Sequence, residues 1–183
     1  MTVNEAITLG RDCEAIQIPS GIRLTLSAGT RVQLTQSLGG TYTVMTETGL
    51  LAHIAGKDAD AIGQDIVPSP IGSAGGMAEE PVEKLVWDRL KTCFDPEIPV
   101  NIVELGLVYC CEVTPLAEGG NKVELRFTLT APGCGMGDVL RRDIESKLRS
   151  VPGVIEADIQ VVFDPPWNPS LMSEAAKLQL GLL

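Results

Sequence analysis

Residues 123–150 read VELRFTLTAPGCGMGDVLRRDIESKLRS, and this stretch decides the fold of the second half of the chain. From Val123 to Thr130 apolar and polar side chains alternate, which predicts a β-strand with one buried face. From the end of the glycine-rich segment Ala131–Gly137 onward, apolar side chains follow helical spacing at Met136, Leu140, Ile144 and Leu148. We therefore expect a strand, a tight turn and a helix that ends before Pro152-Gly153.

The segments on either side extend this pattern. Apolar residues at helical spacing predict a helix over Glu79–Cys93, whose first residues, two glutamates and a proline, suit a helix N-terminus. Alternation predicts further strands at Leu107–Val113 and Ile155–Phe163. The order helix–strand–strand–helix–strand predicts an α+β fold, in which a three-stranded sheet carries two helices on one face. A short amphipathic helix is expected in the tail, residues 164–183.

Residues 1–66 have a different pattern, made of short β-type runs. Turns rich in glycine, proline and serine separate these runs, which lie at residues 16–18, 22–26, 32–35, 42–45 and 50–54. Such spacing predicts a small β-rich domain, either a barrel or a curled sheet. Proline, serine and glycine dominate residues 67–78, which we interpret as a linker. The second domain then comprises residues 79–183.

Composition and charge exclude several classes of function. The 183 residues include 24 acidic and 14 basic side chains, a net charge of −10, so nucleic-acid binding is not expected. No apolar run approaches the roughly 18 residues of a membrane helix, and the first residues do not resemble a signal peptide. We therefore expect a cytoplasmic protein that does not bind membranes. In that compartment the five cysteines are expected to be free thiols or metal ligands rather than disulfides.

The glycine-rich turn carries the strongest chemical signal, Cys134. We expect this cysteine in the first turn of the second helix, where unpaired N–H groups and the helix dipole stabilise an anion by about 0.3–2 kcal/mol. That is worth about one unit of thiol pKa, so Cys134 is expected to ionise near neutral pH. A thiolate is both a nucleophile and a metal ligand. The alternative is a buried structural cysteine, with the glycines serving only the turn.

A second feature is the loop Asp95–Asn101, DPEIPVN. Its two prolines stiffen a segment that presents Asp95, Glu97 and Asn101, and Glu104 follows closely. Such a cluster can bind a metal, accept protons or orient a thiol. The alternative is that these groups cap a helix and solvate the loop.

The remaining cysteines give weaker signals. Cys110 and Cys111 are neighbours on a predicted strand and point to opposite faces, so they cannot easily hold one metal together. Cys111 is expected in the core, while Cys93 and Cys110 are interpreted as spare thiols. Because the sequence has no CxxC pair, a self-contained zinc or iron–sulfur site of the usual spacing is not expected.

Two of these motifs together resemble the signatures of a known family. Residues 95–109, DPEIPVNIVELGLVY, look like the signature loop and first strand of the iron–sulfur cluster assembly (FSCA) domain family, also called the metal–sulfur cluster biosynthetic or PaaD-like family. Thr130–Cys134, TAPGC, resembles its second signature, a Thr-x-x-Gly-Cys turn. The resemblance covers about Glu79–Phe163. This chain departs from many members at Gly135, where they have proline, and the glycine loosens the turn.

The resemblance implies a non-enzymatic maturation factor that helps to assemble iron–sulfur clusters and deliver them to client proteins. It points to Asp95, Glu97, Thr130 and Cys134 as functional positions. Cys134 would be the reactive thiol and a transient ligand of iron or of a cluster. Suf-pathway proteins and iron–sulfur clients are the implied partners. Because a cluster usually has four ligands, we expect one held by Cys134 to be shared across a homodimer or with a partner protein.

Two other functions stay open at this point. The chain can be an adaptor that recruits clients or Suf components through its tail helix and its β-rich domain without binding metal. It can also be a thiol enzyme with Cys134 as nucleophile. The enzyme hypothesis is disfavoured because the single histidine, His53, lies in the other domain, which leaves only Asp95 or Glu97 as a base.

Overall fold

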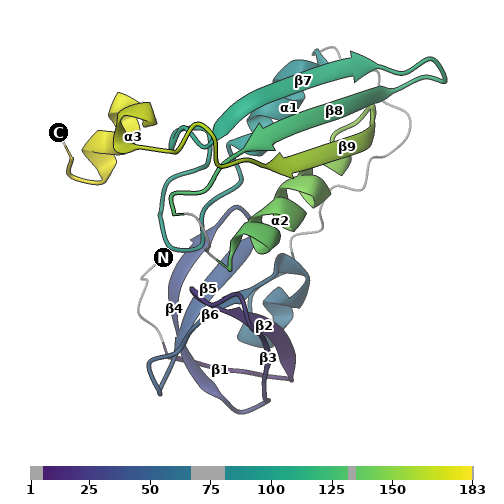
Figure 1. The fold of residues 1–183 in the computed structure, drawn as a ribbon. Helices are drawn as coiled ribbons and strands as arrows, with labels where there is room; N and C mark the ends of the chain where they lie inside the picture. Colours follow the sequence, from purple (N-terminus) through teal and green to yellow (C-terminus); the bar gives the residue numbers. More distant parts are fainter. Residues whose placement is uncertain (1–5, 67–80, 132–134, 183) are drawn as a thin grey trace. The chain divides into compact units, whose positions relative to one another are not determined.

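The structure is a computed structural model of the chain and describes residues 6–66, 81–131 and 135–182 (Figure 1). The chain divides into two compact units, one containing residues 6–66 and the other built from residues 81–131 and 137–182. The expected linker, residues 67–78, lies outside the described residues. None of the helices in the three described ranges is long and apolar enough to cross a lipid bilayer.

The N-terminal unit is a curled antiparallel sheet with strand order β1-β4-β5-β6-β2-β3. Its strands are β1 (Ala6–Thr8), β2 (Cys13–Gln17), β3 (Arg23–Leu26), β4 (Arg31–Leu38), β5 (Thr41–Thr46) and β6 (Leu51–Ile54), followed by the 3-10 helix η1 (Gly56–Ile62). Val32, Val44 and Ile54 lie in its aliphatic core. Strand β1 was not predicted, because three residues are too few to show alternation. It pairs with β4, Ala6 opposite Gln33.

The C-terminal unit combines a three-stranded sheet with helices, which confirms the mixed α+β class expected from the sequence. Its elements are α1 (Val82–Leu90), β7 (Val108–Pro115), β8 (Asn121–Phe127), α2 (Gly137–Arg149), β9 (Val154–Val161), the 3-10 helix η2 (Pro169–Leu171) and α3 (Glu174–Gln179). β7 pairs antiparallel with β8, and β9 pairs parallel with β8. Helix α2 provides the crossover that a parallel pair requires.

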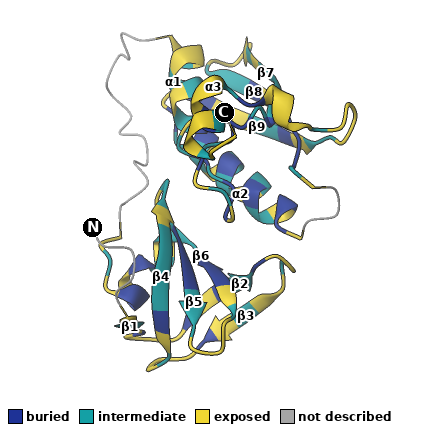
Figure 2. Cartoon of the chain, turned by 90° about the vertical axis from the view of Figure 1, so that its left-hand side faces the viewer, coloured by how far each residue is buried: buried dark blue, intermediate teal, exposed yellow. Residues whose placement is uncertain are grey.

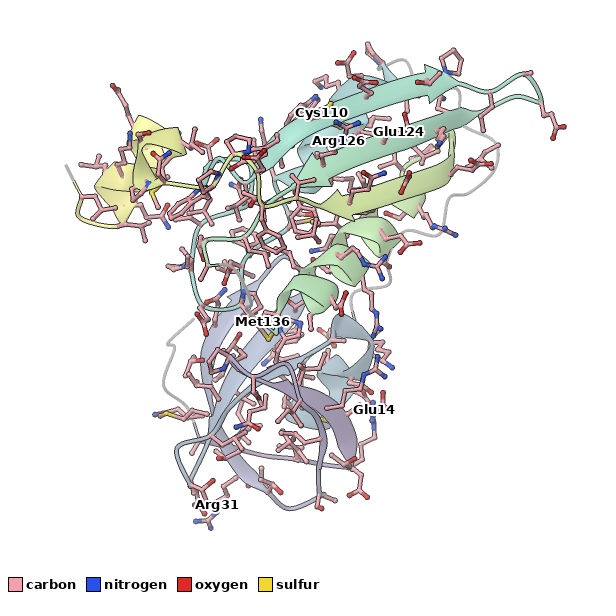
Figure 3. The ribbon with its side chains drawn as sticks, in the orientation of Figure 1. Glu14, Arg31, Cys110, Glu124, Arg126 and Met136 are labelled. Atoms are coloured by element: carbon pink, nitrogen blue, oxygen red, sulfur yellow. The ribbon has the colours of Figure 1, made fainter. Side chains whose placement is uncertain are left out.

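Helices α1 and α2 pack on one face of this sheet (Figure 1). The side chains that fill the interface are almost completely buried, and they are Val86, Leu90, Val123, Leu125, Phe127, Leu140, Ile144 and Leu148. Each such side chain contributes about 1.5–3 kcal/mol through removal of apolar surface from water. The opposite face carries polar side chains, including Glu124 and Arg126 (Figure 3). This division follows the alternation of residues along β8.

Candidate functional site

The signature loop, defined here as residues 95–106, joins α1 to β7, and Asp95 organises its first turn. The Asp95 carboxylate accepts a hydrogen bond from the backbone N–H of Glu97 at 2.9 Å, and its carbonyl accepts one from Ile98 at 3.2 Å. Only 8% of Asp95 is exposed, whereas Glu97 is exposed. Burial raises the pKa of the Asp95 carboxyl, and the Glu97 N–H partly opposes this shift. Asp95 is thus an oriented carboxyl that holds its proton more firmly than a surface aspartate.

Asn101 organises the second turn of the signature loop. Its side-chain oxygen accepts hydrogen bonds from the backbone N–H groups of Val103 at 3.1 Å and Glu104 at 3.0 Å, as a helix N-cap does. Gly106 ends the turn with φ of 68°, and a side chain there would meet the carbonyl group of Leu171. The Asn101 amide oxygen is therefore engaged in building the loop, and Glu104 lies half-buried within it.

The C-terminal tail packs onto the signature loop of the same chain. Three donors of the tail bond to three carbonyl oxygens of the loop: Trp167 Nε1 to Leu105 at 2.9 Å, the Ser173 N–H to Glu104 at 2.9 Å, and Gln179 Nε2 to Pro99 at 2.8 Å. Two side chains of the tail, Met172 and Ala176, are buried. Sequence reasoning did not assign Trp167 or Gln179 to the site, and a lone tryptophan between prolines was the only signal.

Helix α2 contacts the start of the signature loop through Lys147. Its ammonium group donates a hydrogen bond to the backbone carbonyl of Thr92 at 2.8 Å and pairs with Asp143 at 2.7 Å. Both side chains are largely shielded from water, and this burial raises the pKa of the Asp143 carboxyl, opposed by Lys147. The residues just before Asp95 are therefore fixed to α2 by a charged hydrogen bond that periodicity does not predict.

Thr130 lies half-buried beyond the end of β8. The predicted strand ran to Thr130, but β8 ends at Phe127, and the Thr128 N–H donates instead to the carbonyl of Leu107 at 2.8 Å. Thr128 is consequently 1% exposed, although alternation placed it on the polar face. The prediction that Thr128 lies on the polar face was therefore wrong, because the chain has left the sheet by that residue.

Cys134 lies outside the described residues. Gly135 and Met136 form a turn, and α2 begins at Gly137, three positions after Cys134 in the sequence. The expected helix start at the cysteine was therefore too early, and Met136 belongs to the turn rather than to the helical stripe. The helix dipole lowers a thiol pKa mainly within the first helical turn, and that turn begins at Gly137 rather than at Cys134. The lowered pKa of Cys134 therefore stays a prediction.

The four described cysteines are all disfavoured as thiolates. Burial raises the pKa of Cys93 to about 12 and that of Cys111 to about 11. Cys110 lies on the polar face of the sheet (Figure 3), where desolvation and then a hydrogen bond to the Glu112 carboxylate at 3.5 Å raise its pKa. Burial also raises the pKa of Cys13. Cys134 is thus the remaining candidate for a thiol that ionises near neutral pH.

Across residues 6–66, 81–131 and 135–182, no three His, Cys, Asp or Glu side chains lie close enough together to hold a metal ion. Asp95, Glu97 and Glu104 share one loop, but they do not form a metal cage among the described residues. The loop instead presents one buried carboxyl and an exposed one within a rigid frame of backbone hydrogen bonds.

Comparison with known proteins links this arrangement to a family. A model described as iron–sulfur cluster assembly protein matches residues 83–159, which include both signatures. A Porphyromonas gingivalis protein named Fe–S protein maturation auxiliary factor is 46% identical over 55% of this chain and 92% of its own length. The chain belongs to the iron–sulfur cluster assembly protein family.

Other known proteins match over a similar extent. The Staphylococcus aureus Fe–S protein maturation auxiliary factor SufT is 38% identical over 48% of this chain and 96% of its own. A Bacillus anthracis crystal structure, described as domain of unknown function DUF59, is 36% identical, covers 56% of this chain and 93% of that one, and has a TM-score of 0.48. The family model includes neither the N-terminal unit nor the tail beyond residue 159.

Proposed function

We propose that this chain is a non-enzymatic maturation factor that helps to deliver iron–sulfur clusters to client proteins of the Suf pathway. The observation that carries the proposal is the similarity to named maturation auxiliary factors along almost their whole length. The cluster is the cargo in this proposal, and the protein contributes groups that receive it and release it.

Cys134 is proposed to contact the cluster directly as a transient iron ligand, or to contact the carrier protein that holds the cluster. Support comes from the raised pKa values of the other described thiols, since a protonated thiol is a poor metal ligand. A cluster generally needs four ligands, so the others must come from a partner protein or from a second copy of this chain.

The signature loop is proposed to supply the proton chemistry for this thiol. Asp95 has a raised pKa, so it can exchange a proton nearer to neutral pH than a surface aspartate can. Glu97 is exposed and offers an oxygen to iron or a carboxylate to a partner. Thr130 is proposed to place its hydroxyl beside Cys134, while Asn101 and Glu104 hold the loop through their backbone contacts.

Anaerobic reconstitution with iron and sulfide tests the proposal. Wild-type protein is expected to gain iron, sulfide and visible absorbance, and to pass a cluster to an apo iron–sulfur enzyme. Cys134→Ala should lose both properties, whereas Cys110→Ala, which removes a half-exposed thiol from the sheet, should keep them. If wild type and Cys134→Ala bind equally little and activate the enzyme equally well, direct cluster handling is wrong.

A protein adaptor without metal is the second candidate function. It is favoured by the lack of three converging metal-binding side chains among the described residues. An adaptor predicts that Cys134→Ser still supports client activation. Removal of the whole tail does not separate the two functions, because the tail also holds the signature loop. Substitutions of exposed tail side chains are therefore needed.

A further inference from the structure

The last described residues expose large apolar side chains beside the signature loop. Leu178 is 70% exposed, Leu182 is 57% exposed and Leu171 is 43% exposed. In Figure 2, much of α3 has the colour of exposed residues. Single exposed leucines are common on protein surfaces, but here three exposed leucines lie within twelve residues of one segment. We call Leu171, Leu178 and Leu182 the tail leucines.

The tail leucines belong to a segment that is held firmly from its other side. Ala176 is 1% exposed and Met172 is 7% exposed, so the inward side chains of the segment are already packed. The Ser173 hydroxyl caps α3 by accepting a hydrogen bond from the Ala176 N–H at 3.1 Å. The helix therefore keeps Leu178 directed to solvent, rather than being a flexible end that happens to be exposed.

The end of α3 fixes Leu182 in the same way. Gly181 adopts φ of 71°, its N–H donates to Leu178 O at 3.1 Å, and the Leu182 N–H donates to Lys177 O at 2.8 Å. This is the Schellman arrangement, which ends a helix and reverses the chain. Leu182 therefore has a defined position beside the last turn of α3.

The surroundings of the tail leucines are acidic. The adjoining signature loop contains Asp95, Glu97 and Glu104 and no lysine or arginine, while Asp164 and Glu174 lie on the tail itself. Within the described residues, no ion pair involves the side chains of Glu97, Glu104, Asp164 or Glu174. The single basic side chain of the tail, Lys177, donates to the Ser170 carbonyl at 3.2 Å. An exposed apolar surface is thus bordered by unpaired negative charge.

We propose that the tail leucines dock into an apolar groove of a partner protein, and that lysine or arginine side chains border this groove. A short helix that presents apolar side chains to a groove is a common mode of recognition, and complementary charge at the rim speeds association and excludes wrong partners. The proposal deepens the proposed function and rests on it, because the partner would be a protein that gives or receives the cluster. The tail would place that partner beside the signature loop.

Site-specific photo-crosslinking in cells tests the proposal with the full-length protein. The change Leu178→p-benzoylphenylalanine puts the reactive group at the most exposed tail leucine, and the same change at Ala117, exposed on the β7–β8 hairpin of the same unit, is the matched control. We expect a discrete adduct from position 178 only. Mass spectrometry should place the crosslink in an apolar segment of the partner flanked by lysine or arginine.

A second arm tests the charge border. Glu174→Lys in the crosslinking protein should abolish the adduct, whereas Glu118→Lys on the distant hairpin should leave its yield unchanged. A crosslink between two copies of this chain, a crosslink to an acidic or uncharged surface, or no adduct above the Ala117 control would each overturn the proposal. The adduct does not require Cys134, so an adduct that persists in a Cys134→Ser protein with normal client activation rejects the cluster-handling function and retains the docking surface.

Discussion

The indole N–H of Trp167 donates a hydrogen bond of 2.9 Å to the backbone carbonyl of Leu105, a residue 62 positions earlier in the chain. Leu105 is completely buried and lies in the turn that Asn101 caps. The bond therefore fixes the tail to the signature loop at a point where neither segment belongs to a long helix or a strand. The stability of this loop then depends on residues that the family model does not include.

Trp167→Phe tests this bond directly. Phenylalanine keeps an aromatic ring but lacks the five-membered ring that carries the N–H donor, and loss of the hydrogen bond should lower the local opening free energy of the loop by about 0.5–1.5 kcal/mol. Hydrogen exchange of the amides of Val103, Glu104 and Leu105 should accelerate roughly 2- to 12-fold by the same free-energy conversion. Trp87→Phe is the matched control, because the Trp87 indole has no hydrogen-bond partner within the described part of the chain. Equal exchange in both variants would contradict the role of Trp167.

Gly106→Ala should separate the tail from the signature loop. The residue has φ of 68°, which strains any side chain, and the added carbon would meet the Leu171 carbonyl group. We expect faster hydrogen exchange in both segments 101–107 and 167–179. Gly119→Ala has a similar positive φ of 95° on an open hairpin with nothing near the added carbon, so it controls for backbone strain alone. A tail that stays protected in Gly106→Ala would show that the two segments are not coupled.

The buried carboxyl of Asp95 gives stability a defined dependence on pH. Its folded pKa is raised above the usual 3.8, so the folded protein binds the proton more tightly than the unfolded chain. The stabilising contribution of the protonated form is fully present below pH 3.8 and is lost as pH rises through the raised pKa. Asp95→Asn keeps an oxygen that can accept from Glu97 and removes the charge.

We therefore expect Asp95→Asn to unfold at a denaturant concentration equal to or higher than wild type at pH 7. The difference between the two proteins should shrink as pH falls towards 4. Cluster transfer should nevertheless be weaker in Asp95→Asn, because the proton-exchanging group is absent. Denaturation curves at several pH values provide the measurement. A variant that is less stable than wild type at pH 7 and equally active would contradict both the buried charge and its proposed role.

Thiol labelling distinguishes the five cysteines. A thiol with a pKa of about 11, as for Cys111, is ionised in only about one molecule in ten thousand at pH 7, and Cys93 is ionised less. Iodoacetamide at pH 7 should therefore label one site rapidly, and peptide mapping should identify it as Cys134. In Cys134→Ser the fast phase should vanish. A labelling pKa for Cys134 at or above the free value of about 8.5 would reject an activated thiolate.

Lys147→Met should destabilise the C-terminal unit, because it leaves the carboxyl of Asp143 largely buried without its partner and the Thr92 carbonyl without a donor. A loss of about 1–3 kcal/mol in the free energy of unfolding is expected from such uncompensated groups. Asp143→Asn combined with Lys147→Met should recover part of the loss, since the charge is removed as well. Urea denaturation of wild type, Lys147→Met, Asp143→Asn and the double variant measures the effect, and additive losses in the double variant would argue against a pair.

The elements of the C-terminal unit were predictable wherever one face is buried. In β8 and α2, periods of two and of about 3.6 residues place Leu125, Phe127, Ile144 and Leu148 in one core, and that pattern is written in the sequence. The end of β8 was not predictable, because the Thr128 N–H donates a hydrogen bond to the carbonyl of Leu107, which lies just before β7.

The residues that support the candidate site could not be predicted from the sequence, although the acidic residues of the loop could. Asp95, Glu97, Asn101 and Glu104 could be selected because carboxylates and an amide gather in a proline-stiffened loop. Their supports, Trp167 and Lys147, act through backbone carbonyl groups, and carbonyl acceptors are the same for every residue type. A sequence pattern therefore does not predict which backbone carbonyl will accept a hydrogen bond from a distant side chain.

The contacts between tail and loop also have a consequence for the newly made protein. The signature loop is synthesised 62 to 80 residues before the tail donors that bond to it, so three of its carbonyl groups are hydrogen-bonded to water until the tail has been made. The loop therefore gains its last brace only after Gln179 has been synthesised. A chain that stops before the tail would lack both the braced loop and the tail leucines.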